Sequence, residues 1–212
     1  MAEKVKKNKS IRAWVNQHVT DHYVHMAKKD GYRSRAAYKL LEIDSEVNLF
    51  KNVAVVVDLG CAPGSWSQVA LSKVSQGGQV IGVDLLPLEQ IRGLNFIQGD
   101  FTDDAVLSQL ILHIGERQVD LIISDMAPNL SGVRGVDQAR GAYLIELVLD
   151  FASNYLKPGG NCLIKIFHGG EFDQLVKTAR GLFAQVVVRK PEASRSGSSE
   201  TYLLCKNKHA KL

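Results

Sequence analysis

The stretch that most constrains how this chain can fold is Val53–Trp66, which reads VAVVVDLGCAPGSW. A β-branched apolar run ends in Asp58 and passes directly into a turn that contains Gly60, Pro63 and Gly64. The run predicts a buried strand, and the turn residues predict the start of a helix. In an open α/β sheet, ligands bind in the crevice beyond the carboxyl ends of the strands. Because glycine has no Cβ, a ligand can approach the backbone closely there. A tight turn that binds nothing would explain this segment alone equally well.

Strand-like and helix-like segments alternate along the rest of the chain. Strands are predicted at residues 53–59, 79–84, 94–98, 119–124, 161–167, 183–189 and 201–206. Helices are predicted at residues 66–74, 102–113, 137–156 and 171–182. Thr102 would be the N-cap of the second helix, and the KPGG sequence at 157–160 would end the third. This alternation predicts an α/β fold, a doubly wound and mostly parallel seven-stranded sheet with helices on both faces.

Positive charge is concentrated at the beginning of the chain. Residues 1–39 contain ten lysines or arginines and three acidic residues, so they carry +7, which leaves −3 for the remainder of a chain of net charge +4. A basic arm on a mildly acidic domain indicates a polyanionic partner, and we expect nucleic acid. A solvated lysine tail would explain residues 4–9 equally well. We divide the chain into residues 1–33, a basic tail and helix for RNA contact, and residues 34–212, a single domain.

The cysteines and the apolar segments indicate a cytoplasmic protein. No apolar run approaches the roughly 20 residues that cross a bilayer, and the lysine-containing first ten residues lack the apolar stretch of a secretory signal. Cys61, Cys162 and Cys205 have no C-x-x-C spacing, and two of them lie in strand-like runs. We interpret them as small buried hydrophobic residues, and we expect neither a disulfide, nor a metal site, nor a membrane partner.

Three acidic residues, Asp84, Asp100 and Asp125, follow successive predicted strands. In a doubly wound sheet, these positions line one crevice beside the turn after the first strand. Asp84 comes 20 residues after Gly64, the spacing at which dinucleotide folds hold a ribose diol. We therefore interpret Asp84 as a ribose ligand and Asp100 as the acceptor for an adenine amino group. Asp58 could hold a ribose, an amine or a bridging water. A helix cap would explain any one of these acids alone.

The turn between the first strand and its helix narrows the choice of ligand. Its sequence, GCAPG at 60–64, lacks the G-x-G-x-x-G of dinucleotide sites, and the chain has no G-x-x-x-x-G-K-[ST] phosphate loop. These absences argue against NAD and ATP. A ligand that contains adenosine and no phosphate fits better, and S-adenosylmethionine is such a ligand.

Four segments carry a resemblance to a known family. DLGCAPGSW at 58–66, DLLP at 84–87, QGDF at 98–101 and SDMAPN at 124–129 resemble, in order and spacing, the FtsJ/RrmJ ribosomal RNA 2′-O-methyltransferases. The same family is resembled by Lys165 and by residues 34–36, 131–132 and 189–191. The similarity as a whole runs from about residue 14 to residue 204. Cys61 and Ser65 stand where bacterial members often have Ala and Gly; both are small, and we expect no loss of function.

The resemblance implies a class I methyltransferase sheet with a reversed final strand, and S-adenosylmethionine as the methyl donor. It also implies a catalytic tetrad of Lys39, Asp125, Lys165 and Glu200. The turn and the resemblance together imply cofactor contacts from Asp58, Gly60, Gly64, Trp66, Asp84, Asp100 and Asp125. We expect RNA phosphate contacts from Arg33, Arg35 and Arg195.

The tetrad suits methylation of a hydroxyl group. The hydroxyl must lose its proton during transfer, and a neutral amine can accept it. A free lysine is protonated near neutral pH, but the positive charges of Lys39 and of the sulfonium favour neutral Lys165. Asp125 would orient Lys165, and Glu200 would orient the ribose or Lys39. Apolar neighbours argue against a solvent-facing Lys165, whereas Glu200 could also be a solvated acid in a loop.

The predicted function is methyl transfer from S-adenosylmethionine to the ribose 2′-oxygen of a uridine in 23S ribosomal RNA. The resemblance implies the large ribosomal subunit as the partner, and no extra apolar face of the chain indicates a dimer. The alternatives are a non-catalytic RNA-binding ribosome assembly factor that retains a nucleoside site, and a nicotinamide-dependent reductase. Lys165 within an apolar strand argues against the assembly factor, because binding alone needs no amine at that position.

Overall fold

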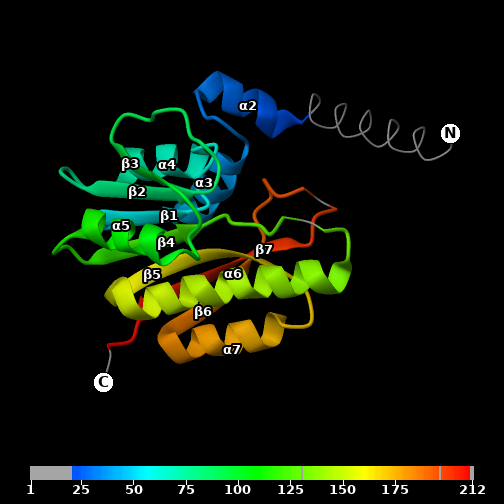
Figure 1. Ribbon diagram of the computed structural model, residues 1–212. Coiled ribbons are helices and arrows are strands. Elements are labelled where there is room, and N and C mark those ends of the chain that lie inside the picture. The colour runs from blue at the N-terminus through cyan, green and yellow to red at the C-terminus, as the bar shows by residue number, and fades with distance from the viewer. Residues whose placement is uncertain (1–20, 130, 196, 211–212) are drawn as a thin grey trace.

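The computed structural model describes residues 21–129, 131–195 and 197–210 (Figure 1). Within them, seven strands form one sheet in the order β3-β2-β1-β4-β5-β7-β6, and β7 is antiparallel to both of its neighbours. The strands are β1 (Val55–Leu59), β2 (Gln79–Asp84), β3 (Leu94–Gln98), β4 (Val119–Ser124), β5 (Leu156–Phe167), β6 (Phe183–Arg189) and β7 (Glu200–Lys208). This topology confirms the predicted Rossmann-like methyltransferase sheet with its reversed final strand.

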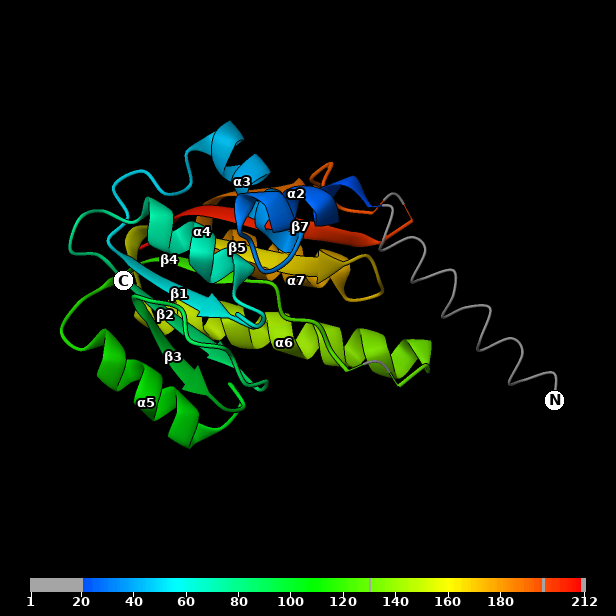
Figure 2. The ribbon, with the colours of Figure 1, turned by 90° about the horizontal axis from the view of Figure 1, so that it is seen from above.

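Two layers of helices enclose the sheet (Figures 1 and 2). The helices of the described residues are α2 (His22–Asp30), α3 (Ala36–Val47), α4 (Ser65–Lys73), α5 (Asp104–Ile114), α6 (Arg134–Tyr155) and α7 (Phe172–Leu182). Val56 of β1 belongs to the core cluster under α3 and α4, whereas Val55 and Val57 belong to the cluster under α5, α6 and α7. Because side chains alternate along a strand, a strand covered on both faces needs a continuous apolar run.

The observed strands differ most from the prediction in β5. β2, β3, β4 and β6 have the predicted bounds, but β5 begins at Leu156 rather than at residue 161. α6 ends at Tyr155, and Leu156 is already extended, buried and paired with Val119 of β4. The KPGG sequence therefore does follow the end of the helix, but it lies within the strand, next to a register irregularity between β4 and β5.

The N-cap of α5 is Asp103, and the prediction of Thr102 is wrong. The Asp103 carboxylate accepts a hydrogen bond from the Ala105 N–H at 2.9 Å. Thr102 instead donates through both its N–H and its hydroxyl to Asp100 Oδ1, at 2.9 and 2.8 Å. An aspartate two residues earlier in the chain thus binds the threonine in a local turn and leaves the cap position to Asp103.

The three cysteines are buried as free thiols, as predicted. Cys162 of β5 and Cys205 of β7 are register partners in the sheet. Among the helices formed by the described residues, none combines the length and the apolar character that a bilayer crossing requires.

Candidate active site

The carboxyl ends of β1, β2, β3 and β4 surround a cavity of about 560 Å³, which we call the strand-end cavity. Its walls come from the loops after these strands and from α6. The structure brings four of the predicted cofactor contacts together in its lining, namely Gly60, Asp84, Asp100 and Asp125. This is the location where open α/β sheets bind ligands.

The turn after β1 fits closely against the loop after β4. Gly60 has φ +77°, and a Cβ at this position would lie 2.5 Å from Met126 Cγ and 3.0 Å from the Met126 backbone. The Gly60 N–H donates to the Val83 carbonyl at 2.9 Å, and the Ala62 N–H donates to Asp84 Oδ2 at 2.8 Å. Glycine at position 60 therefore allows the loops to meet, and the turn holds the Asp84 side chain at the cavity.

Asp84 and Asp100 are held in place by backbone groups while keeping acceptor capacity. Asp84 Oδ1 accepts the Leu86 N–H at 2.8 Å, so each Asp84 oxygen has one backbone donor. Asp100 Oδ1 accepts both bonds from Thr102, and among the described residues Oδ2 accepts none. Since a carboxylate has about four lone-pair sites, both side chains can still accept hydrogen bonds from a ligand.

The charge of the strand-end cavity indicates what it can hold. Its described lining carries the carboxylates of Asp84, Asp100 and Asp125 against one cationic side chain, that of Arg140. Phosphate groups would be repelled by these acids, whereas a positively charged group would be attracted. Exposed apolar side chains such as Leu85 and Tyr143 also line it. The lining thus favours a ligand that carries a positive charge and apolar surface, and it disfavours a ligand with phosphate groups.

The remaining three predicted cofactor contacts do not line the cavity, and their direct contact with a cofactor stays a prediction. Gly64 has φ +107°, and a Cβ there would lie 2.4 Å from Ile91 Cδ1. Trp66 is buried, and its Nε1–H donates to the Ala36 carbonyl at 2.8 Å. Asp58 is fully buried and accepts a hydrogen bond from Ser67 Oγ at 2.6 Å.

Asp58 is an unusual carboxylate. Its Oδ1 is buried without a hydrogen-bond partner among the described residues. Burial raises the pKa of Asp58 to about 7, while the bond from Ser67 opposes this rise and the nearby Asp125 and Asp84 add to it. The folded protein thus favours the protonated acid, because the ionised form is costly in an enclosed site.

The four residues of the predicted tetrad form two ion pairs. Lys165, at 9% exposure in β5, donates from Nζ to the Asp125 carbonyl at 2.5 Å and lies 3.1 Å from Asp125 Oδ1. Lys39 of α3 lies with Nζ 2.5 Å from Oε1 of Glu200, the first residue of β7. Lys165 and Glu200 are therefore held within the protein, which argues against the alternatives of a solvent-facing lysine and a solvated loop acid.

Tyr202 joins the two ion pairs, and the sequence analysis missed it. Its hydroxyl lies 2.8 Å from Asp125 Oδ1 and 3.1 Å from Glu200 Oε1. Having one proton, it can donate to only one of them at a time. Burial, with Asp125 and Glu200 next, raises the pKa of Tyr202 above its ordinary value. Tyr202 follows Glu200 by two residues, the period at which strand side chains share a face, and this spacing was the available signal.

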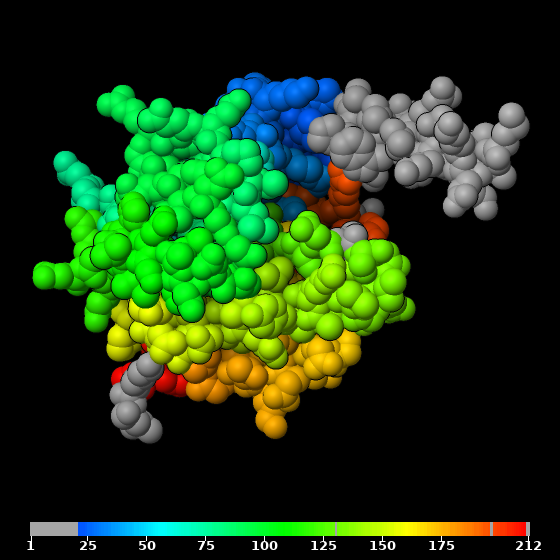
Figure 3. Space-filling view, in the orientation of Figure 1, coloured from blue at the N-terminus to red at the C-terminus, as the bar shows by residue number. Residues whose placement is uncertain are grey.

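Glu200 stays ionised although much of it is buried. Burial alone would raise its pKa, but attraction to Lys39, the hydrogen bond from Lys39, attraction to Lys165 and the Tyr202 hydroxyl together lower the pKa below its ordinary value. In the space-filling view, the surface is hollowed between the blue N-terminal helices and the yellow-green α6, where orange segments that precede β7 are visible (Figure 3). α3 and the beginning of β7, which carry Lys39 and Glu200, meet on this side of the sheet.

Lys165 is adjacent to the strand-end cavity. It lines a small cleft together with Met126, Pro128 and Leu144, and these three residues also line the strand-end cavity. Asp125, its ion-pair partner, lines the strand-end cavity directly. An amine oriented by a carboxylate beside a ligand cavity is an arrangement suited to proton transfer.

Two of the three predicted RNA-binding arginines contact the protein itself. The Arg33 guanidinium donates to the carbonyls of Pro63, Glu89 and Gln90 at 3.1, 2.8 and 3.1 Å, so it ties the turn after β1 to the segment before β3. Arg35 forms an ion pair with Asp21 and donates to the Ala193 carbonyl. Arg195 lies in the loop before β7. RNA contacts by all three stay predictions, and most of the basic segment 1–33 lies outside the described residues.

No group of three or more histidine, cysteine, aspartate or glutamate side chains in the described part of the chain is arranged to hold a metal ion.

Comparison with known proteins identifies close relatives. A model of the FtsJ-like methyltransferase family matches residues 32–208. The ribosomal RNA large subunit methyltransferase E of Neisseria meningitidis serogroup C is 54% identical over 202 residues, which cover 95% of this chain and 98% of the relative. The protein of the same name from Cellvibrio japonicus is 51% identical over 200 residues, which cover 94% and 95%.

Solved structures agree with the fold. The crystal structure of a Plasmodium falciparum protein assigned as a ribosomal RNA methyltransferase has a TM-score of 0.74 at 31% identity, and the match covers 85% of this chain and 100% of that chain. Human methyltransferase-like protein 13, in complex with SAH, has a TM-score of 0.56 at 16% identity over 81% of this chain and 79% of that chain. At that identity the second likeness shows the fold alone.

Proposed function

This chain belongs to the FtsJ-like methyltransferase family, and from this premise we propose that it transfers a methyl group from S-adenosylmethionine to the ribose 2′-oxygen of a uridine in 23S ribosomal RNA. The relatives that match almost their entire length carry the name ribosomal RNA large subunit methyltransferase E. The observation that carries the proposal is the Lys165–Asp125 ion pair beside the strand-end cavity.

The strand-end cavity is the site proposed for the methyl donor. Asp84 would accept the ribose hydroxyls, Asp100 would accept the adenine amino group, and Asp125 would lie nearest the positive charge. When bound, S-adenosylmethionine supplies an electrophilic methyl group on a positively charged sulfur. The acidic lining favours this cation and disfavours the phosphates of NAD, which supports a methyltransferase over a nicotinamide-dependent reductase.

Lys165 is proposed to accept the proton of the 2′-hydroxyl. In its neutral form the Nζ atom has a lone pair for that proton, and Asp125 fixes the position of Nζ through contacts of 2.5 and 3.1 Å. Glu200 holds Lys39 at 2.5 Å, so the positive charge of Lys39 stays within the same group of side chains. Holding reactants in line at attack distance can contribute about 7–11 kcal/mol to lowering the barrier.

We further propose that the enzyme acts as a monomer in the cytoplasm and takes the large ribosomal subunit, or a precursor of it, as its substrate. The buried free thiols suit a reducing compartment. An assembly factor without catalytic activity would have no use for a lysine that is 9% exposed and paired with an aspartate at the cavity wall.

The test is to map 2′-O-methylation on ribosomal particles incubated with the protein and labelled S-adenosylmethionine. Lys165→Ala should lower kcat by about 10²- to 10⁴-fold, the usual contribution of a general base, while the Kd for S-adenosylmethionine stays within a few-fold. Turnover by Lys165→Ala equal to that of the wild type would remove Lys165 as the base, and particles left unmethylated by the wild type would contradict the proposed function.

Lys208 supplies the matched control. It is a lysine of similar burial, 8% exposed, at the far end of β7, where it donates to the carbonyls of Ser153 and Leu156 at 2.8 and 2.6 Å. Lys208→Ala should lower thermal stability without lowering kcat of the folded protein. A loss of kcat in both variants would mean that Lys165→Ala acts through folding.

A further inference from the structure

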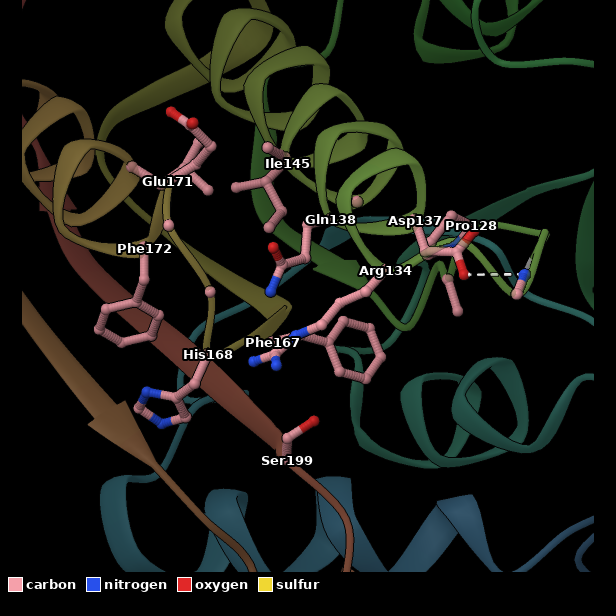
Figure 4. A pocket seen from close by; sticks show the side chains of 17 residues that line it. Pro128, Arg134, Asp137, Gln138, Ile145, Phe167, His168, Glu171, Phe172 and Ser199 are labelled. Carbon is pink, nitrogen blue, oxygen red and sulfur yellow. Dashed lines mark hydrogen bonds between the residues drawn. The ribbon is translucent and has the colours of Figure 1, made fainter.

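A second cavity, of about 540 Å³, opens between α6, α7 and the loop after β5, and we call it the α6–α7 cavity (Figure 4). The proposed methyl-donor site does not use it. Its walls include three aromatic side chains, Phe167, His168 and Phe172, and two polar side chains from α6, Arg134 and Gln138. A cavity of this size is sufficient for a small organic ligand.

The α6–α7 cavity adjoins the candidate catalytic group. The Phe167 ring in its lining has its centroid 6.0 Å from Lys165 Nζ. Ser199, which directly precedes Glu200 in the chain, also lines the cavity. Pro128 lines both cavities, so the loop after β4 separates them. A molecule whose reacting atom lies at Lys165 would therefore have this second cavity beside it.

The aromatic walls and the polar groups of the α6–α7 cavity are arranged for a flat, polar ligand. His168 and Phe172 are stacked, with ring centroids 4.4 Å apart and an interplanar angle of 18°. In Figure 4, the Arg134 guanidinium and the Gln138 amide point into the space between this ring pair and the Phe167 ring. Stacked rings offer a platform for another planar ring.

The polar groups of this cavity are free to bind a ligand. Within the described chain, neither Arg134 nor Gln138 forms a hydrogen bond or ion pair with another side chain or with the backbone outside its own helix. Asp137, which lies between them in α6, is engaged at both carboxylate oxygens, because it accepts bonds from Ser131 and Gly132. A Cβ on Gly169 would lie 3.0 Å from Gln138 Nε2, so a glycine at this position lets the loop after β5 approach the amide.

We propose that the α6–α7 cavity receives the base of the nucleotide that is methylated. This inference rests on the proposed function, since it takes an RNA ribose as the acceptor. The 2′-oxygen is joined to the base through C2′ and C1′ only, so a ribose held at Lys165 places its base in the neighbouring space. Proteins commonly stack unpaired RNA bases on aromatic side chains. The Gln138 amide offers one donor group and one acceptor, which can match the polar edge of a uracil.

A base-binding site in this cavity restricts the acceptor to one class of nucleotide. A base that is paired and stacked within a helix cannot enter a cavity lined by Phe167 and Phe172. The acceptor is therefore an unpaired nucleotide, or one that leaves its stack, with its base bound on the α6 side of Lys165. Arg134, exposed at the rim, supplies the positive charge for an adjacent phosphate.

The experiment compares two substrates for the same enzyme. Large-subunit particles are reconstituted with the natural target nucleotide or with an abasic ribonucleotide that keeps its 2′-hydroxyl. One stacked base changes affinity by roughly 5- to 150-fold. We expect Phe172→Ala to raise KM for natural particles by a factor in this range, and the abasic target to raise the wild-type KM similarly. For Phe172→Ala acting on the abasic target, KM should rise little beyond the rise that either change causes alone, because each removes the same contact.

Three controls make the result decisive. Tyr155→Ala removes another half-buried aromatic side chain that packs on the same core cluster, and it should lower stability without raising KM. The Kd for S-adenosylmethionine should be unchanged in Phe172→Ala. Gln138→Ala, which removes no aromatic packing, should show a smaller rise of KM that is also absent with abasic particles, and it replaces Phe172→Ala in the test if that variant does not fold.

Opposite outcomes overturn the proposal in recognisable ways. If Phe172→Ala and Gln138→Ala leave KM unchanged, or if their effects multiply in full with that of the abasic target, the base does not bind in the α6–α7 cavity. That result would leave methylation by the wild type intact. If the wild type methylates neither kind of particle, the proposed function itself fails.

Discussion

The strand-end cavity and the α6–α7 cavity lie on either side of the loop after β4, yet their polar groups are held in opposite ways. In the first, Asp84 and Asp100 are already bound by backbone and side-chain donors of their own neighbourhood. In the second, Arg134 and Gln138 have no such partners within the described chain. The first cavity is preorganised for a small ligand, whereas the polar side chains of the second cavity can adjust to a larger partner.

α6 contributes to both cavities through different sides of the same helix. Arg140, Tyr143 and Leu144 line the strand-end cavity, whereas Arg134 and Gln138 belong to the α6–α7 cavity. Residues three or four positions apart lie on the same side of a helix, so one long helix can supply two separate walls. Donor affinity and RNA affinity should therefore respond to different substitutions.

The largest expected effect concerns the carboxylate beneath the strand-end cavity. Burial raises the pKa of Asp58 to about 7, so between about pH 4 and pH 7 the folded protein holds a proton that the unfolded chain has released. The stabilising contribution of this proton is full below about pH 4 and is lost as the pH rises through 7. That loss is about 4 kcal/mol in the free energy of unfolding, and Asp58→Asn should abolish it. Urea denaturation between pH 4 and pH 8 measures this loss in both proteins.

Asp120, a carboxylate whose pKa is shifted in the opposite direction, provides the control. Burial would raise the pKa of Asp120, but bonds from Lys157 and from the Val55 and Ala54 N–H groups lower it overall. Its stabilising contribution is therefore present at neutral pH and is lost as the pH falls. Asp120→Asn should flatten the acid side of the stability curve only. Parallel curves for wild type and Asp58→Asn from pH 5 to 8 would show that Asp58 does not hold the proton.

The second prediction concerns the contribution of Asp84 to binding of the methyl donor. Asp84→Ala removes the acceptor for the Ala62 and Leu86 N–H groups and one wall of the strand-end cavity. A hydrogen bond to a charged group contributes about 1.5–3 kcal/mol, so the Kd for S-adenosylmethionine should rise by roughly 10- to 150-fold, as measured by isothermal titration calorimetry. KM for ribosomal particles at saturating donor should not change.

Asp103→Ala is the matched variant for Asp84→Ala. Asp103 also accepts a backbone N–H, that of Ala105, but it caps α5 and does not line the cavity. Its loss should cost about 1 kcal/mol of stability and leave the donor Kd unchanged. An Asp84→Ala protein with the wild-type Kd would mean that the donor binds elsewhere.

The smallest effect separates backbone strain from crowding in the turn after β1. Gly31 and Gly60 have φ +79° and +77°, but a Cβ on Gly31 meets nothing within 4 Å, whereas one on Gly60 meets Met126 at 2.5 Å. Gly31→Ala should cost about 1–2 kcal/mol from the left-handed conformation alone. Gly60→Ala should cost about 1 kcal/mol more because of overpacking, which corresponds to a further fall in Tm of about 2–4 °C. Equal Tm values for both variants would refute this crowding.

Much of the fold could be predicted because its central strands are buried on both faces. Continuous apolar runs such as those of β1 and β4 are distinctive. The edge strands β3 and β6 are partly exposed, and their bounds nevertheless match the prediction. The start of β5 could not be predicted in the same way. Whether residues 157–160 leave the sheet or join it depends on pairing with β4, a contact between distant parts of the chain.

The candidate site could likewise be predicted only in part. The acids after the strands and the tetrad of Lys39, Asp125, Lys165 and Glu200 could be named from motifs, and the structure brings the tetrad into two ion pairs. The contacts of Arg33 and Arg35 with carbonyl groups could not be foreseen, because a sequence shows charge but not which groups accept it. The α6–α7 cavity likewise exists only where α6, α7 and the loop after β5 meet.

The hydrogen bonds of the Arg33 side chain link three separate segments of the chain. This one side chain joins the segment between α2 and α3 to both Pro63 and residues 89–90, and α2 ends three residues before it. A displacement of the segment between α2 and α3 would therefore move the turn after β1, which carries Gly60 and Ala62 of the strand-end cavity. The position of α2 and the shape of that cavity are thus coupled through one arginine side chain.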